Sequence, residues 1–169
     1  GRFSAASYQF LTREERIDAA DAIFTGKVKS ISQTKWNQDS GEKWMSDPAD
    51  PNPNSPASLM IHTLTIEVDQ PIVDTINLGK EVSITVIGNS PYDGTTDHGL
   101  QVGDSALFFA EERNLAWKEG GVQKNLMMVS SPADSYLIYR SDGLYHTKKD
   151  DQPPVSLGDL IKEIAKRRG

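Results

Sequence analysis

Alternation of apolar and polar residues predicts four short β-strands in this chain. The four segments are residues 23–28, 64–68, 82–86 and 106–110. In the first of them, Phe24, Gly26 and Val28 share one face, and we expect Gly26 to mark a bend or a close approach of another backbone. Residues 106–110 are apolar on both faces, so this strand should be covered on both sides. Together the four segments predict a small curled antiparallel sheet, a barrel.

Turn-forming residues separate these strands and indicate further ones. Residues 77–80 form a plausible turn between the second and third strands, and Pro71 is expected to end the second. The Asp142-Gly143 pair favours a tight hairpin turn. It would join a strand at 136–140 to a returning strand at 144–147, and residues 122–129 are another strand candidate. Ile31 breaks the alternation of the first strand, which predicts a β-bulge.

Two helices are predicted to flank the sheet. Thr12 and Glu15 have the spacing of a capping box, which places a helix at 11–22. Ser156 caps a second helix, at 156–167. That helix carries an apolar stripe suited to docking on the barrel, formed by Leu157, Leu160, Ile161 and Ile164. We therefore expect a single domain over 1–169, with the β-barrel at 23–147.

The composition excludes several kinds of chemistry. The 169 residues include no cysteine, which rules out disulfides, thiolate nucleophiles and zinc–cysteine or iron–sulfur sites. The net charge of −6 disfavours nucleic acids and anionic lipids as partners. The basic residues Lys162, Lys166, Arg167 and Arg168 are expected to lie near the negative end of the last helix. No apolar run is long enough to span a membrane.

The chain begins with Gly1-Arg2-Phe3 and has no initiating methionine. Removal of a signal peptide or a lipoprotein anchor would explain this start, and simple removal of a disordered end is the alternative. We favour export and expect a secreted or cell-envelope protein.

Residues 33–58 form a long loop rich in proline and polar residues. A loop of this length in a compact domain is usually functional or disordered. It contains Trp36 and Trp44, which either bind a ligand or merely cover one end of the barrel. For Trp117 the covering role is favoured.

Residues 89–100 form a second polar loop. Asp93, Asp97 and His98 are candidate metal ligands there, although an ordinary Asx-type loop is the favoured interpretation. A calcium site is a similar possibility in loop 33–58, where the oxygen donors would be Asp47, Asp50, Asn52 and Asn54. The prolines of that loop favour a disordered linker instead. The sequence contains no nucleophile elbow, phosphate-binding loop or dinucleotide fingerprint, and its three histidines do not form the helical zinc-protease pattern.

Four stretches of the chain resemble netrin-like domains, the superfamily of the tissue inhibitors of metalloproteinases and their exported bacterial relatives. Residues 19–28 are similar to the opening helix and first barrel strand of that superfamily, residues 64–73 to its second strand with the following turn, and residues 102–109 to a later strand. Residues 139–145, followed by the last helix, resemble the tail of the bacterial relatives. The resemblance implies an OB-fold-like five-stranded antiparallel barrel, here with an added hairpin and a C-terminal helix. The eukaryotic members chelate zinc through an N-terminal cysteine, which this chain lacks, so no functional residue carries over.

The sequence thus favours a non-enzymatic exported domain that binds a protein or a saccharide through loops 33–58 and 89–100, with no cofactor. One alternative is a metal-dependent hydrolase that uses residues 93–98. Another is a structural module of a cell-envelope protein.

Overall fold

The computed structural model describes residues 10–92 and 98–169, and these are mainly β-sheet with flanking helices. The strands are β1 (Ala22–Ile31), β2 (Lys35–Trp36), β3 (Met60–Asp74), β4 (Glu81–Ile87), β5 (Ser105–Ala116), β6 (Val122–Met128), β7 (Tyr136–Tyr139) and β8 (Tyr145–His146). The helices are α1 (Arg13–Ala19), a 3₁₀ turn at Pro132–Asp134, and α2 (Leu157–Arg168).

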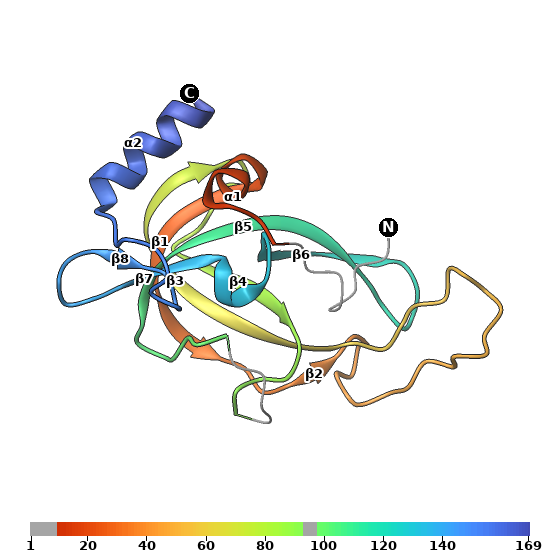
Figure 1. The fold of residues 1–169 in the computed structure, drawn as a ribbon. Coiled ribbons are helices and arrows are strands. Elements are labelled where there is room, and N and C mark those ends of the chain that lie inside the picture. The colour runs from red at the N-terminus through yellow and green to blue at the C-terminus, as the bar shows by residue number, and fades with distance from the viewer. Residues whose placement is uncertain (1–9, 93–97) are drawn as a thin grey trace.

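Five strands close into a ring in the order β1-β3-β4-β6-β5, and β5 pairs back onto β1 (Figure 1). The ring is antiparallel except where β4 meets β6, at the parallel pair Thr85 and Met127. There the Thr85 hydroxyl also donates to Asn125 Oδ1 over 3.0 Å. The β7–β8 hairpin extends the sheet beyond β5. The predicted OB-like five-stranded barrel with an added hairpin is therefore confirmed.

The β5 strand separates two hydrophobic cores. Phe108 points into the barrel and packs against Phe24 of β1, with ring centroids 5.5 Å apart. Leu107 and Phe109 point outward into a second core, which α1 and α2 cover. All three side chains are fully buried. The prediction that this strand is covered on both faces is confirmed.

At Gly26, β3 approaches β1 closely. A Cβ atom on Gly26 would lie 2.6 Å from Ile66 Cγ2 and 2.7 Å from the Glu67 carbonyl oxygen. Register shifts on both sides of this region, including the one predicted before Ile31, bend β1 around the barrel. Only a residue without a side chain fits at this contact.

The prediction that Pro71 ends the second strand is wrong, because β3 continues to Asp74. The β4 strand pairs with β3 only as far as Glu67, so beyond that point one edge of β3 has no strand partner among the described residues. A proline, which has no N–H to donate, is tolerated on such an edge. Pro71 pairs with Phe24 next to a register shift in β1.

The capping box of α1 is confirmed: Thr12 and Glu15 each accept a hydrogen bond from the other's backbone N–H. The helix is shorter than the expected 11–22, because Ala20 already has extended backbone angles. From Ala22 onward the chain pairs with both β3 and β5, and these strand contacts prevail over continuation of the helix.

The α2 helix docks beside α1 on the outer face of the barrel (Figure 1). Its Ser156 cap is confirmed, and Leu160 and Ile164 of the predicted apolar stripe are buried. Arg168, a basic residue of its last turn, also contacts α1. Arg168 Nη1 donates to the carbonyl oxygens of Ile17 and Ala20 over 2.7 and 2.6 Å, so it caps α1. Across residues 10–92 and 98–169, no helix combines the length and hydrophobicity that a membrane crossing requires.

Candidate functional site

The long loop 33–58 extends away from the barrel beside the tip of the β5–β6 hairpin (Figure 1). Asn37 fixes its base and is fully buried. Asn37 Nδ2 donates to the carbonyl oxygens of Ala57 and Ala116, over 2.8 and 3.0 Å. Its Oδ1 accepts from the Leu59 amide over 2.7 Å and from Trp44 Nε1 over 3.0 Å. One side chain therefore joins both ends of the loop to the hairpin.

The tip of the β5–β6 hairpin, residues 117–121, packs against the same loop. Trp117 Nε1 donates to Asp39 Oδ1 over 2.7 Å, and the Asp39 amide donates to Glu119 Oε1 over 2.9 Å. The Trp117 ring packs on a small hydrophobic cluster formed by Ile61, Ile87, Leu115 and Met127. The Lys118 amide donates to the Asn37 carbonyl oxygen over 3.0 Å.

Trp44 and Lys118 meet at a cavity of about 490 Å³ inside the loop. Lys118 Nζ lies 5.7 Å from the centre of the Trp44 ring, within the range of a cation–π contact. Trp36 does not line this cavity, because it lies on β2, where it pairs with Met60. The two tryptophans of the loop are thus separated, and Trp44 alone contributes to the concave surface.

Polar side chains hold the far part of the loop in consecutive turns. Asp47 Oδ1 accepts from the Ala49 amide, Asp50 Oδ1 from the Asn52 amide and Asn52 Oδ1 from the Asn54 amide; the distances are 2.8, 2.9 and 2.9 Å. The Ser55 hydroxyl donates to Asp50 Oδ2 over 2.6 Å, and this bond, with that from Asn52, lowers the pKa of Asp50. Asp47, Asp50 and Asn52, three of the four residues considered as calcium ligands, therefore each use a side-chain oxygen within the loop.

The second predicted loop contacts the first at its beginning. The Ser90 amide donates to Thr34 Oγ1 over 2.8 Å, and Ser90 is buried. Asp93 and Asp97 lie outside the described residues. His98 is buried, and its ring nitrogens contact His62 Nε2 and the Leu100 amide, both over 3.1 Å. A metal ion on His98 would have to displace one of these bonds. In the part of the chain that the structure describes, no three acidic, histidine or cysteine side chains are grouped to hold a metal.

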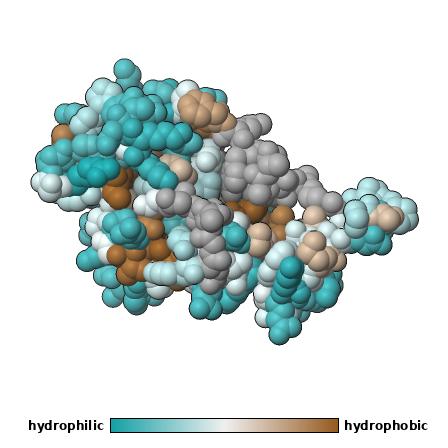
Figure 2. All heavy atoms as spheres, turned by 60° about the horizontal axis from the view of Figure 1, so that its bottom comes forward, coloured by the Kyte–Doolittle hydropathy of each residue, from teal (hydrophilic) through white to brown (hydrophobic). Residues whose placement is uncertain are grey.

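The face shown in Figure 2 is mostly hydrophilic, and its hydrophobic residues form small separate patches. Met45, next to Trp44, is among the most exposed large apolar side chains, at 71%. Sequence reasoning identified Trp44 but missed Asn37 and Lys118. The Gly120-Gly121 pair signals the hairpin tip that presents Lys118, yet nothing in the local sequence connects that tip with a loop some seventy residues earlier.

Comparison with protein-family models and with curated proteins finds no match for this chain. The resemblance to netrin-like domains therefore stays a prediction from short sequence motifs.

Proposed function

We propose that this protein is a non-enzymatic binding domain that recognises a partner protein through loop 33–58. Trp44, Met45 and Lys118 would form the centre of the contact. The observation that carries the proposal is that the loop projects from the barrel and is held in one shape by the buried Asn37.

Preorganisation is the first argument for binding. A flexible loop loses conformational entropy when it binds, and a loop already held by internal bonds loses less. Asn37 anchors the base, and the turns around Asp50 and Asn52 hold the far part. This supports recognition by a preformed surface.

The exposed residues of the loop are the second argument. Aromatic residues and methionine are enriched in protein interfaces. Met45 is largely exposed, and Trp44 lines a cavity beside it. A side chain from a partner would pack in the cavity beside the indole and Lys118, where aromatic and aliphatic surfaces meet a positive charge.

The position of the loop on the barrel is the third argument. In OB-type barrels, ligands commonly bind across the loop after the first strand and the loop between the last two strands. Here these are loop 33–58 and the hairpin tip, which contact each other. The analogy concerns the place only, since the fold does not define the ligand. The net charge of −6 favours an uncharged or cationic partner over a polyanion.

A saccharide is the second candidate ligand. The lining of the cavity favours it, because Trp44 lies among Ser46, Asn52 and Asp50. An indole packs against the C–H face of a sugar ring, and hydroxyl, amide and carboxylate groups hydrogen-bond to its hydroxyls.

Site-specific photo-crosslinking tests the protein-binding proposal. A photoreactive amino acid replaces Met45 in one variant and Val102, which is 51% exposed on another loop, in a control. We expect Met45 to crosslink to a partner that Val102 does not capture. We also expect the purified partner to bind Trp44→Ala more weakly than the wild type. Equal crosslinking at both positions, or unchanged affinity for Trp44→Ala, would refute the proposal.

A panel of defined oligosaccharides tests the second candidate. Binding that quenches tryptophan fluorescence in the wild type and in Trp36→Phe, but not in Trp44→Phe, would favour a saccharide over a protein.

A further inference from the structure

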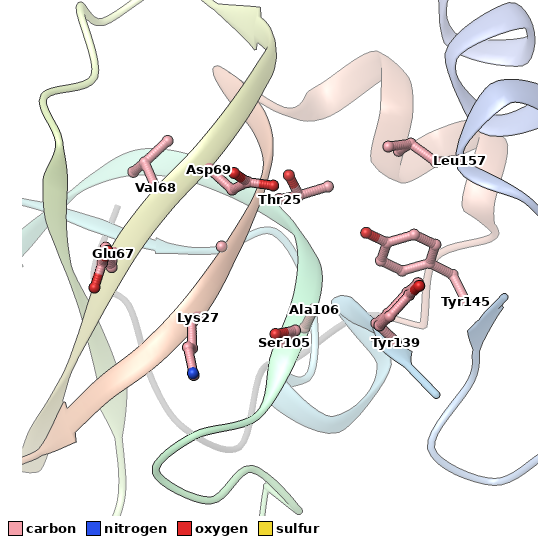
Figure 3. A pocket seen from close by; sticks show the side chains of 11 residues that line it. Thr25, Lys27, Glu67, Val68, Asp69, Ser105, Ala106, Tyr139, Tyr145 and Leu157 are labelled. Atoms are coloured by element: carbon pink, nitrogen blue, oxygen red, sulfur yellow. The ribbon is translucent and has the colours of Figure 1, made fainter. Parts of the chain in front are cut away.

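A second concave surface lies beside the β7–β8 hairpin, and no residue of loop 33–58 lines it (Figure 3). It is a groove of about 510 Å³. Residues of four strands are among those that line it: Thr25 and Lys27 of β1, Glu67 and Asp69 of β3, Tyr139 of β7 and Tyr145 of β8. Its volume falls in the range of small-ligand sites, about 300–1,000 Å³. The groove therefore has room for more than a single ion.

Two tyrosines form one wall of the groove. Tyr139 and Tyr145 are directly paired across β7 and β8, with ring centroids 5.3 Å apart and planes inclined by 55°. Tyr139 is 48% exposed, whereas Tyr145 is only 7% exposed. An exposed aromatic face next to a buried one offers an electron-rich surface to a ligand.

The hydroxyl of Tyr145 is directed into this groove. Figure 3 shows it pointing toward Thr25 and Asp69. It makes no hydrogen bond to any part of the chain that the structure describes, and it lies at the groove although the residue as a whole is only 7% exposed. Among the described residues, no buried side-chain oxygen or nitrogen lacks a partner, so this hydroxyl is open to the solvent in the groove. The groove thus presents a hydroxyl that can donate a hydrogen bond to a ligand or accept one from it.

The charge of the groove is negative. Glu67 and Asp69 contribute two carboxylates and Lys27 one ammonium group. Within residues 10–92 and 98–169, Asp69 forms no ion pair. Burial, and then the nearby charges of Tyr139 and Asp69, raise the pKa of Tyr145. Its hydroxyl consequently stays protonated at neutral pH and serves as both donor and acceptor.

We propose that this groove binds the cationic side chain of a peptide, arginine or lysine. The Asp69 carboxylate would pair with the cation, the Tyr139 ring would contribute a cation–π contact, and the Tyr145 hydroxyl would accept one of its N–H groups. The rest of the groove would hold the neighbouring peptide backbone. Loop 33–58 contributes no residue to this site, so the two proposals stand or fall separately.

An NMR titration tests the proposal with defined probes. The wild-type protein is titrated with N-acetyl-arginine methylamide, with its uncharged citrulline analogue and with methylguanidinium. We expect the amide signals of Thr25, Lys27 and Ser105, all at the groove, to shift with the arginine probe. The citrulline probe should bind about tenfold more weakly, because it lacks the charge that pairs with Asp69. Methylguanidinium should bind more weakly than the arginine probe, because it lacks the peptide backbone that the rest of the groove would hold.

Three variants separate the proposed contacts. Asp69→Asn removes the charge, Tyr139→Ala removes the exposed ring and Asp159→Asn removes a carboxylate outside the groove. We expect the first two to weaken the arginine probe about fivefold or more and the third to leave it unchanged. Asp69 and Tyr139 are exposed, and the amide spectrum of each variant verifies its fold. Absence of shifts at millimolar arginine probe, equal binding of the citrulline probe, or unchanged affinity of Asp69→Asn would overturn the proposal.

Discussion

His62 and His98 face each other inside the protein with their Nε2 atoms 3.1 Å apart, and both side chains are buried. His62 Nδ1 lies 3.0 Å from the Gly88 carbonyl oxygen, so it must carry a proton. His98 Nδ1 accepts from the Leu100 amide, so it must carry none. The proton between the rings therefore belongs to His98 Nε2. This chain of hydrogen bonds fits only two neutral imidazoles.

Acidification should destabilise the protein through His62. Burial lowers the pKa of His62 below its ordinary value of 6.5, despite the opposing bond to Gly88. As the pH falls below 6.5, the unfolded chain therefore takes up a proton that the folded chain does not. We expect the free energy of unfolding to be fully retained above that pH. Below it, the His62 contribution should fall by up to about 1.4 kcal/mol per pH unit.

Urea unfolding between pH 5 and 8 measures this effect, with His62→Gln as the matched control. Glutamine keeps a donor for Gly88 and an acceptor for His98 but does not titrate. The difference between wild type and variant should vary with pH only below about 6.5. If the free energies of unfolding of wild type and variant varied with pH in parallel, the pKa of His62 would be the same in the folded and unfolded chains.

Replacement of Asn37 should weaken the anchor of loop 33–58. Asn37→Ala removes four hydrogen bonds from a fully buried site, so we expect a loss of about 3 kcal/mol in urea unfolding. Asn37→Asp should cost at least as much, because a carboxylate oxygen would face the carbonyls of Ala57 and Ala116.

Asn54→Asp makes the same change on an exposed residue of the same loop. Its unfolding free energy should stay within about 0.5 kcal/mol of the wild type. If Asn37→Asp were equally mild, the hydrogen bonds assigned to Asn37 would be wrong.

A methyl group at Gly26 should disrupt the contact between β1 and β3. Gly26→Ala places an atom against Ile66 and the Glu67 backbone, so we expect a loss of about 2 kcal/mol or more. The control is Gly158→Ala in α2, where nothing lies within 4 Å of the added Cβ. That substitution should be neutral or stabilise the protein by up to about 1 kcal/mol, because alanine favours helix. Thermal unfolding ranks the two variants, and a stable Gly26→Ala would contradict the close approach.

Loss of the Arg168 side chain should loosen the packing of α1 on α2. Arg168→Gln removes the guanidinium that caps the carbonyls of Ile17 and Ala20, with an expected cost of about 1 kcal/mol. Hydrogen exchange of the α1 amides should rise in this variant. Lys166→Gln, which changes an exposed neighbour in the same helix turn, should leave both measurements unchanged.

Local pattern was enough to predict most elements of the barrel. The period-two faces of β1, β3 and β4, the caps at Thr12 and Ser156 and the turn at Gly143 depend on residues near one another in the chain. Such features are expressed within a few residues, so the sequence reveals them. Pro71 shows the limit, because its tolerance depends on which edge of β3 lacks a neighbour.

The sequence by itself therefore determined the fold class, its helix caps and the two long loops. Only the tertiary structure decided which side chains act together. Asn37 meets Ala116, His62 meets His98, and Tyr145 faces Asp69 because closure of the ring and docking of the hairpin bring distant strands side by side. Period and propensity describe one strand at a time, and they hold no information about the partner that a side chain meets across the fold.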